Sequence, residues 1–335
     1  MARLAAGSSR ANASALISRR QSGVALITVL LITAILVGMT TQILSRHHLV
    51  TRQHQNTFEL DQAMQYALGA EELARQALYD DFVNSGPGVD TLEEFWASSA
   101  LPFDLDGVGV MQAYVVDMHR CFNLNSLAGS QRNENHQRLQ NLLSRLGLAP
   151  ELADLIKDWV DADLEVTGLG AEDATYLLSQ PAYLTPNQPM VDISEVDMLA
   201  DVETAQLQAL AQETCIRPDT SLNINVNTAS ARTLSALDPG LTDEEALAIT
   251  QESRNFLTVD DFISVYPSFA AARLELSVTS EYFTLVGQAQ LNSSRVSLRS
   301  LLQRDTENGQ IHLLQRDFGK RFRTNYLAAY EAEST

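Results

Sequence analysis

The chain has 335 residues and a formal charge of −19, from 23 Lys and Arg against 42 Asp and Glu. This acidic balance argues against nucleic acid as the main partner, because a polyanion is repelled by it. With 45% hydrophobic and 19% charged residues, the chain has the composition of a folded protein. The charge is uneven, since no Asp or Glu precedes Glu59 whereas six arginines do. A basic, apolar N-terminus on an acidic body indicates a membrane segment joined to an exported domain.

An uncharged segment of 21 residues, Val24–Leu44, is the first predicted element. As a helix it would extend about 30 Å, enough to cross a bilayer once. Arg10, Arg19 and Arg20 precede it, so the positive-inside rule predicts a cytoplasmic N-terminus and a periplasmic body. Two further arginines just beyond the segment weaken this asymmetry. An uncleaved anchor is one interpretation, because no Ala-x-Ala cleavage site follows the segment.

The start of the chain resembles the class III signal of type IV pilins and type II secretion pseudopilins: a short basic leader, Gly, then an apolar helix. In those families a prepilin peptidase cuts after the Gly and methylates the new N-terminus. The resemblance implies a leader of residues 1–23 and processing between Gly23 and Val24. Most members carry Glu as the fifth mature residue, where this chain has Thr28. The K-type minor pseudopilin family, GspK, lacks this Glu, which is consistent with a tip subunit that has no neighbouring amine above it to neutralise.

The apolar helix is predicted to continue over residues 45–82, because apolar side chains recur every three or four positions up to Leu78. Ser85-Gly86-Pro87-Gly88 would end it. A membrane anchor followed by an unrelated stalk is the alternative. The predicted packing face consists of Ala63, Tyr66, Ala67, Ala70, Leu73, Ala74, Ala77 and Leu78.

Strand-like alternation occurs at Val110–Met118 and again only near the C-terminus, at Tyr282–Leu291, Arg295–Gln303 and Gln310–Phe318. We therefore predict an α+β fold: a long N-terminal helix packed on an antiparallel sheet, with a large inserted α-domain. The predicted divisions after the helix are 83–120 (loop and first strand), 121–277 (α-domain), 278–318 (C-terminal strands) and 319–335 (tail). This order of elements resembles that of the GspK family over nearly the whole chain.

The inserted region contains a weak duplication, since Asn123-Leu124-Asn125-Ser126 matches Asn225-Val226-Asn227-Thr228. The second copy, residues 225–249, looks like a helix-hairpin-helix unit, a module that in DNA-binding proteins approaches phosphates. Acidic residues 243–245 follow its hairpin and would repel a duplex. We therefore favour a scaffold for protein contacts, with a membrane-anchored DNA receptor as the alternative.

A dense acidic stretch around residues 158–173 is the candidate metal site. Asp161, Asp163 and Glu165 alternate, and the glycines after them can fold a loop that returns further carboxylates. Such an arrangement suits Ca²⁺, which takes about 6 to 8 oxygen ligands, although a solvated acidic face is the alternative. The stretch also resembles the calcium-binding α-domain segment of GspK members through Trp159, Asp161, Asp163 and residues 170–173. The predicted ligands are Asp161, Asp163, Glu165, Glu172, Asp173 and Asn187, the last of which could instead be a turn residue.

The only cysteines, Cys121 and Cys215, are predicted to form a disulfide in an oxidising periplasm, with two buried thiols as the alternative. No G-x-S-x-G, H-E-x-x-H or phosphate loop is present, which favours a non-catalytic protein. The resemblance to GspK implies a tip subunit of the periplasmic pseudopilus that initiates assembly and limits extension. It further implies minor pseudopilins of types I, J and H, the prepilin peptidase and the inner-membrane secretion platform as partners. A type IV pilus tip subunit remains an alternative.

Overall fold

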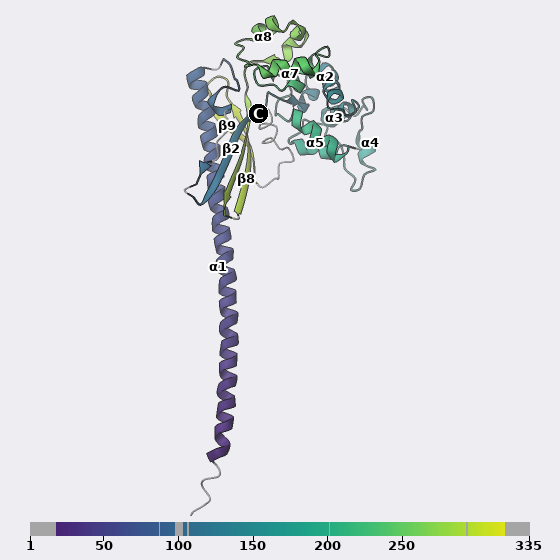
Figure 1. The fold of residues 1–335 in the computed structure, drawn as a ribbon. Coiled ribbons are helices and arrows are strands. Elements are labelled where there is room, and N and C mark those ends of the chain that lie inside the picture. Colours follow the sequence, from purple (N-terminus) through teal and green to yellow (C-terminus); the bar gives the residue numbers. More distant parts are fainter. Residues whose placement is uncertain are drawn as a thin grey trace, which may run out of the picture. The chain divides into compact units, whose positions relative to one another are not determined.

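The computed structural model describes residues 18–86, 88–97, 103–105, 107–200, 202–292 and 294–318, without the side chains of residues 18–22, 85 and 204. Residues 1–17 of the predicted leader and the predicted tail, 319–335, therefore lie outside the described residues. The chain divides into two compact units, residues 1–61 and 62–335. The helix α1 (Ser18–Ser85) begins in the first unit and ends in the second (Figure 1).

In the first unit, α1 presents exposed side chains throughout Val24–Phe58. The helix is long and apolar enough to cross a membrane. Its threonines are compatible with lipid, because each hydroxyl donates to a carbonyl three or four residues earlier. Thr28 Oγ1 donates to the Ala25 carbonyl at 2.9 Å, and Thr41 Oγ1 to that of Val37 at 2.7 Å.

The second unit contains a five-stranded sheet in the order β1-β2-β7-β8-β9, with every neighbouring pair antiparallel. Its long strands confirm all four strand predictions. β2 pairs with β7 along its whole length. The 164 residues between the end of β2 at Asp117 and the start of β7 at Tyr282 are therefore an insertion between two adjacent strands. The strands are β1 (Phe103–Asp104), β2 (Gly109–Asp117), β7 (Tyr282–Leu291), β8 (Ser294–Arg304) and β9 (Ile311–Phe318).

The C-terminal part of α1 packs on one face of this sheet. Ala63, Ala67, Ala70, Ala74 and Leu78 are buried there, and the four alanines allow the helix to approach the strands closely. The predicted face was wrong at one position, because Leu73 is 62% exposed. The helix ends at Ser85, three residues beyond the predicted end.

A buried carboxylate also fixes α1 on the sheet. Glu71 is only 3% exposed and pairs with Arg316 of β9 at 2.5 Å, while the Ser300 hydroxyl of β8 donates to it. The Arg316 and Ser300 hydrogen bonds lower the pKa of Glu71 in spite of its burial. The packing face predicted from the sequence did not include Glu71.

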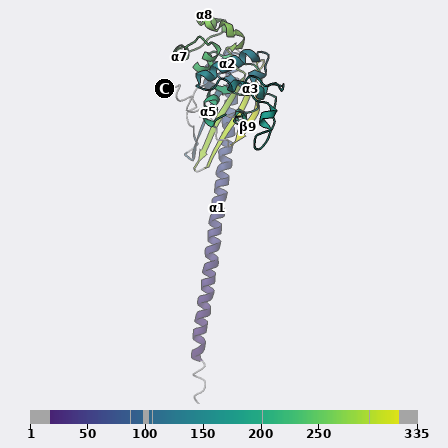
Figure 2. The ribbon, with the colours of Figure 1, turned by 90° about the vertical axis from the view of Figure 1, so that its right-hand side faces the viewer.

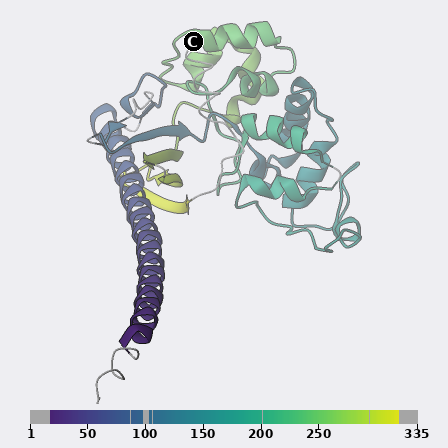
Figure 3. The ribbon, with the colours of Figure 1, turned by 60° about the horizontal axis from the view of Figure 1, so that its bottom comes forward.

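The inserted region is mainly helical and packs on the opposite face of the sheet (Figures 2 and 3). Arg299 of β8 lies on the face opposite α1, because the residues before and after it face α1. Its guanidinium is 3.7 Å from the Asp192 carboxylate of the insertion. The helices are η2 (Leu124–Ala128), α2 (Arg132–Arg145), α3 (Leu152–Val160), α4 (Asp173–Tyr176), η3 (Ile193–Met198), α5 (Thr204–Glu213), α6 (Ala231–Leu237), α7 (Asp243–Gln251), α8 (Val259–Val265) and η4 (Pro267–Glu275), with η1 (Phe95–Ala97) preceding β1.

The insertion is built from two copies of one motif. Each copy starts with a two-residue strand, continues through helices, and ends with a strand that pairs in parallel with the first: β3 (Phe122–Asn123) with β4 (Thr214–Cys215), and β5 (Ile224–Asn225) with β6 (Leu276–Ser277). In both copies the second Asn of the Asn-x-Asn motif binds a distant backbone segment. Asn125 bonds to both backbone groups of Met190, and Asn227 to both backbone groups of Phe256.

A side chain of the first copy contacts the hairpin of the second copy. Arg145, at the end of α2, donates to the Leu241 carbonyl at 2.6 Å and pairs with Asp243 at 2.7 Å. In DNA-binding modules this hairpin faces phosphate, whereas in this chain it is a contact between the two copies.

Candidate metal centre

The acidic loop predicted from the sequence folds over two carboxylates of α3. Asp154 and Asp158 lie one turn apart, and the loop backbone donates to them: Leu169 N–H to Asp154 at 2.9 Å and Thr167 N–H to Asp158 at 3.0 Å. A Cβ at Gly170 would lie 2.1 Å from an Asp158 oxygen. The loop therefore requires glycine where it passes closest to α3, and its return brings residue 172 back towards residue 161.

Three of the predicted ligands converge at this loop. Asp161, Asp163 and Glu172 each offer an oxygen, and the three oxygens lie within 4.8 Å of one another. Asp161 and Glu172 are buried, whereas Asp163 is exposed. Asp161 comes from the end of α3 and Glu172 from just before α4, so the folded loop creates the group.

The carboxylates of this group repel one another, and those of Asp161 and Glu172 are buried. Burial raises the pKa of Asp161 to about 6, with further contributions from Asp163 and Asp158. Burial also raises the pKa of Glu172 to about 7, with Asp158, Asp161 and Asp173 adding to the effect. A cation among them would remove this repulsion and keep all three ionised.

The unpaired polar atoms at the site fit a hard cation. Among the described residues, Asp161 Oδ1, Glu172 Oε1 and Asn187 Oδ1 are buried without a hydrogen-bond partner. Buried oxygens without donors are costly, and carboxylate and amide oxygens are the ligands that Ca²⁺ prefers. Asn187 has a φ of 48°, in the left-handed region, and follows Thr185, whose hydroxyl donates to Glu172 at 3.2 Å. The segment that carries Asn187 thus runs along the acidic group.

The other two predicted ligands have different surroundings. Glu165 is exposed, and its backbone N–H donates to Asp163 at 2.9 Å. Asp173 Oδ1 accepts from both the backbone N–H and the hydroxyl of Thr185, at 3.0 and 2.7 Å. Neither belongs to the group of three converging carboxylates. Asp173 instead connects the start of α4 to the segment leading to Asn187.

The predicted disulfide between Cys121 and Cys215 is confirmed, with the two Cα atoms 5.8 Å apart. It lies where the parallel pair β3–β4 closes the first copy of the motif.

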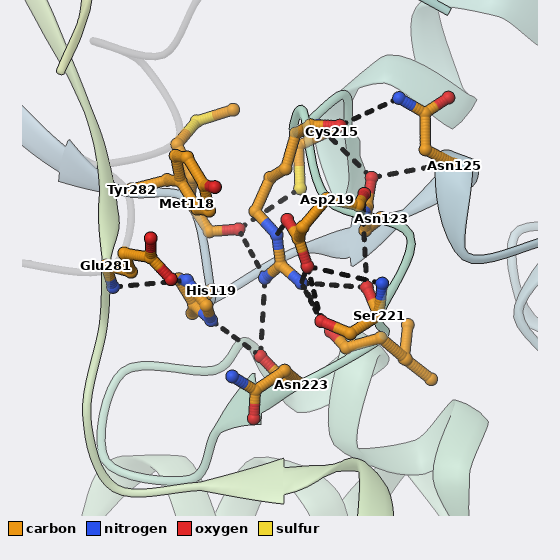
Figure 4. Close-up of polar contacts among 12 residues, drawn as sticks. Met118, His119, Asn123, Asn125, Cys215, Asp219, Ser221, Asn223, Glu281 and Tyr282 are labelled. Atoms are coloured by element: carbon orange, nitrogen blue, oxygen red, sulfur yellow. Dashed lines mark hydrogen bonds and ion pairs between the residues drawn. The ribbon is translucent and has the colours of Figure 1, made fainter. Parts of the chain in front are cut away.

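Around the disulfide the structure contains a buried polar network that the sequence had not indicated (Figure 4). At its centre, Arg217 is fully buried and pairs with Asp219 at 2.9 Å. Its guanidinium also donates to the carbonyls of Met118, Ser221, Leu222 and Asn223.

His119 extends this network to the sheet. Its Nδ1 lies 2.8 Å from the Asn223 carbonyl, and its Nε2 accepts the Glu281 N–H at 3.2 Å. These partners require a neutral ring with its proton on Nδ1. Burial, followed by the nearby Arg217 charge, lowers the pKa of His119 to about 4. His119 therefore connects the insertion to the start of β7 through a ring that stays neutral at neutral pH.

A second polar cluster lies where the chain passes between the sheet and the insertion. Asp117 Oδ2 accepts from Thr228 at 2.5 Å and from Ser280 at 2.7 Å. Asp90 pairs with Arg304 of β8 at 2.5 Å, and burial raises the pKa of Asp90 to about 6. Both clusters join residues more than 100 positions apart, so no local pattern could have revealed them.

Taken with the fold, these features define a pilin-like protein with an inserted helical region. Two family models, both described as "Type II secretion system (T2SS), protein K", match residues 120–219 and 224–284, one on each copy of the motif. The type II secretion system protein K of Pseudomonas aeruginosa is 34% identical over 318 residues, covering 90% of this chain and 94% of that protein. The protein of the same name from Klebsiella pneumoniae is 34% identical over 325 residues, covering 90% and 98%.

A solved structure shares the fold. The crystal structure of the GspK-GspI-GspJ complex from the type 2 secretion system of enterotoxigenic Escherichia coli contains a chain that matches with a TM-score of 0.71 and 29% identity, over 81% of this chain and 99% of that one. This chain therefore belongs to the type II secretion system protein K family, the K-type minor pseudopilins. The family does not support the two alternatives, a DNA receptor and a type IV pilus tip subunit.

Proposed function

We propose that this minor pseudopilin is non-catalytic and occupies the tip of the periplasmic pseudopilus, where it initiates assembly and limits extension during protein export. The observation that carries the proposal is the position of the insertion. It interrupts the sheet between the adjacent strands β2 and β7 and contacts the face opposite α1, where Asp192 of the insertion pairs with Arg299 of β8. A subunit of this bulk has room at the end of a filament and obstructs a subunit stacked above it.

The N-terminal helix supports the same placement. If the leader is removed after Gly23, Thr28 stands where most pseudopilins carry the Glu that meets a neighbour's amine. Its hydroxyl already donates to the Ala25 carbonyl. The helix thus supplies no intramembrane carboxylate at this position, as suits the last subunit of the filament.

The partners follow from the family. A relative of known structure is part of a GspK-GspI-GspJ complex, so pseudopilins of types I and J are the first partners to test. Type H, the prepilin peptidase and the inner-membrane platform complete the proposed set. The apolar part of α1 would anchor the chain in the inner membrane, with the N-terminus cytoplasmic and the sheet and insertion periplasmic.

Calcium is the proposed cofactor of the insertion. Asp161, Asp163 and Glu172 would hold the ion together with the Asn187 side-chain oxygen, and Glu165 and Asp173 remain predicted ligands. The ion would supply the positive charge that the three converging carboxylates lack. Its role is structural, because it would fix the return of the acidic loop over α3.

The tip proposal is tested by deleting the chain's gene in its own host and restoring it in two forms. One form is the full chain, and the other has residues 122–277 replaced by a short flexible linker. The full chain should restore secretion and filaments of normal length. The shortened chain should give longer filaments when the major pseudopilin is overproduced. Filaments of equal length in both strains, with the shortened chain present at normal levels, would contradict the proposal.

A further inference from the structure

A ring of basic and imidazole side chains encircles α1 just beyond its apolar segment. We call Arg46, His47, His48, Arg52 and His54 the basic collar. All five are exposed, and no Asp or Glu occurs between residue 24 and residue 58. The collar therefore lies on a stretch of helix whose charged groups are all of one sign.

The collar is distributed around the helix rather than along one face. With 3.6 residues per turn, successive side chains are separated by about 100°. Relative to Arg46, His47 and His54 lie at about 100° and 80°, and His48 and Arg52 at about 200° and 240°. A contact with another helix uses one stripe of side chains. Donors on three sides instead match a ligand that surrounds the helix.

The collar begins at the depth of lipid headgroups. Arg46 follows Leu44, the last residue of the apolar segment, by two positions, and the collar extends about 12 Å along the axis. Side chains of an α-helix lean towards its N-terminus, so those of Arg52 and His54 point back towards the membrane. The headgroup layer is about 5 to 8 Å thick on each side of the hydrocarbon. Glu59 comes 13 residues after Arg46, beyond this layer.

Arginines at this end of the membrane helix oppose the expected topology, because positive charge favours the cytoplasmic side. An attraction on the periplasmic side would offset that disadvantage. We propose that the basic collar binds the phosphate groups of anionic phospholipids in the periplasmic leaflet. This inference rests on the membrane orientation of the proposed function. The two guanidinium groups supply fixed charge and paired donors, and the three imidazoles add further hydrogen-bond partners.

The test uses the full chain in nanodiscs of phosphatidylethanolamine and phosphatidylglycerol. Spin-labelled lipids of each type report the selectivity of the first lipid shell for phosphatidylglycerol. In the R46Q/R52Q variant this selectivity should fall by about threefold, since both positive charges that attract the anionic headgroups are removed. The R232Q/R295Q variant removes the same charge from exposed positions of the second unit and should match the unaltered chain. High salt should remove the difference.

Any of three other outcomes would overturn the inference that the collar binds anionic phospholipid. Equal selectivity in the R46Q/R52Q and R232Q/R295Q variants would show that the collar does not select anionic lipid. Unchanged lipid selectivity together with weaker co-purification of pseudopilins I or J would assign the collar to a protein partner and leave the proposed function intact. Failure of the chain to enter nanodiscs would overturn both the collar and the membrane anchoring on which it depends.

Discussion

Replacing carboxylates of the acidic group in the insertion should change the stability of the protein in opposite directions without and with calcium. The variant D161N/E172Q keeps the shape of both side chains and removes two of the three converging carboxylates. Without calcium this change should stabilise the protein at pH 8, because burial, together with repulsion from nearby carboxylates, raises the pKa of Glu172 to about 7 and of Asp161 to about 6, and the neutral amides avoid both costs. With calcium it should destabilise the protein, because the ion loses two ligands.

The magnitudes follow from linkage. One pKa unit corresponds to about 1.4 kcal/mol, and after allowance for relaxation of the loop we expect a gain of about 1 to 2 kcal/mol without calcium. Calcium at a hundred times its dissociation constant should stabilise the unaltered chain by about 2.7 kcal/mol. For a unit of this size that is a rise in Tm of about 5 to 10 °C.

The assay is thermal unfolding of the full chain at pH 8 in detergent, with calcium, with magnesium, and with chelator. The unaltered chain should respond to calcium and the variant should not. Asp197→Asn, a change on η3 of the insertion outside the acidic group, provides a control that keeps the response. A variant that is less stable than the unaltered chain in chelator would refute the reasoning, and so would an unaltered chain whose Tm ignores calcium.

Three further predictions concern the stability of the second unit. Burial raises the pKa of Glu94 to about 7, so the folded state holds this proton more tightly than the unfolded state, and the free energy of unfolding should fall as pH rises from about 4.5 through 7. Glu94→Gln should flatten this decline and add about 1 kcal/mol at pH 8, as measured by urea unfolding across pH. Gly170→Ala should cost about 1 to 3 kcal/mol, because its Cβ would lie 2.1 Å from a buried carboxylate oxygen, whereas Gly69→Ala, with open space around it, should be neutral or slightly stabilising; equal Tm values for both would contradict the account of the loop. The double change of Cys121 and Cys215 to Ser opens a loop of 94 residues and should lower the free energy of unfolding by about 2 to 5 kcal/mol, while an unaltered denaturation midpoint under non-reducing conditions would show that the bridge adds no stability.

The regular elements could be predicted because their patterns are local. Along β8 and β9 more buried positions alternate with less buried ones, and α1 repeats its buried alanines every three or four residues. The two-residue strands β3 to β6 could not be predicted, since a strand of that length has no period. Leu73 shows a further limit, because helical spacing alone does not reveal how wide the buried stripe is.

The candidate site was predicted in part for the same reason. Asp161 and Asp163 are two positions apart in the sequence, and the glycines after them indicated a return of the chain. The partners of His119 and Arg217 come from segments up to 162 residues away, so only the fold brings them together. Glu71 was absent from the predicted packing face because its counter-ion, Arg316, lies 245 residues further along the chain.

A processed filament subunit of the secretion system differs from a membrane-anchored or secreted protein in its intact mass after extraction from native membranes. The mass should correspond to loss of residues 1–23 and a methylated N-terminal Val24. A mass that retains Met1, or that corresponds to cleavage beyond Leu44, would contradict it.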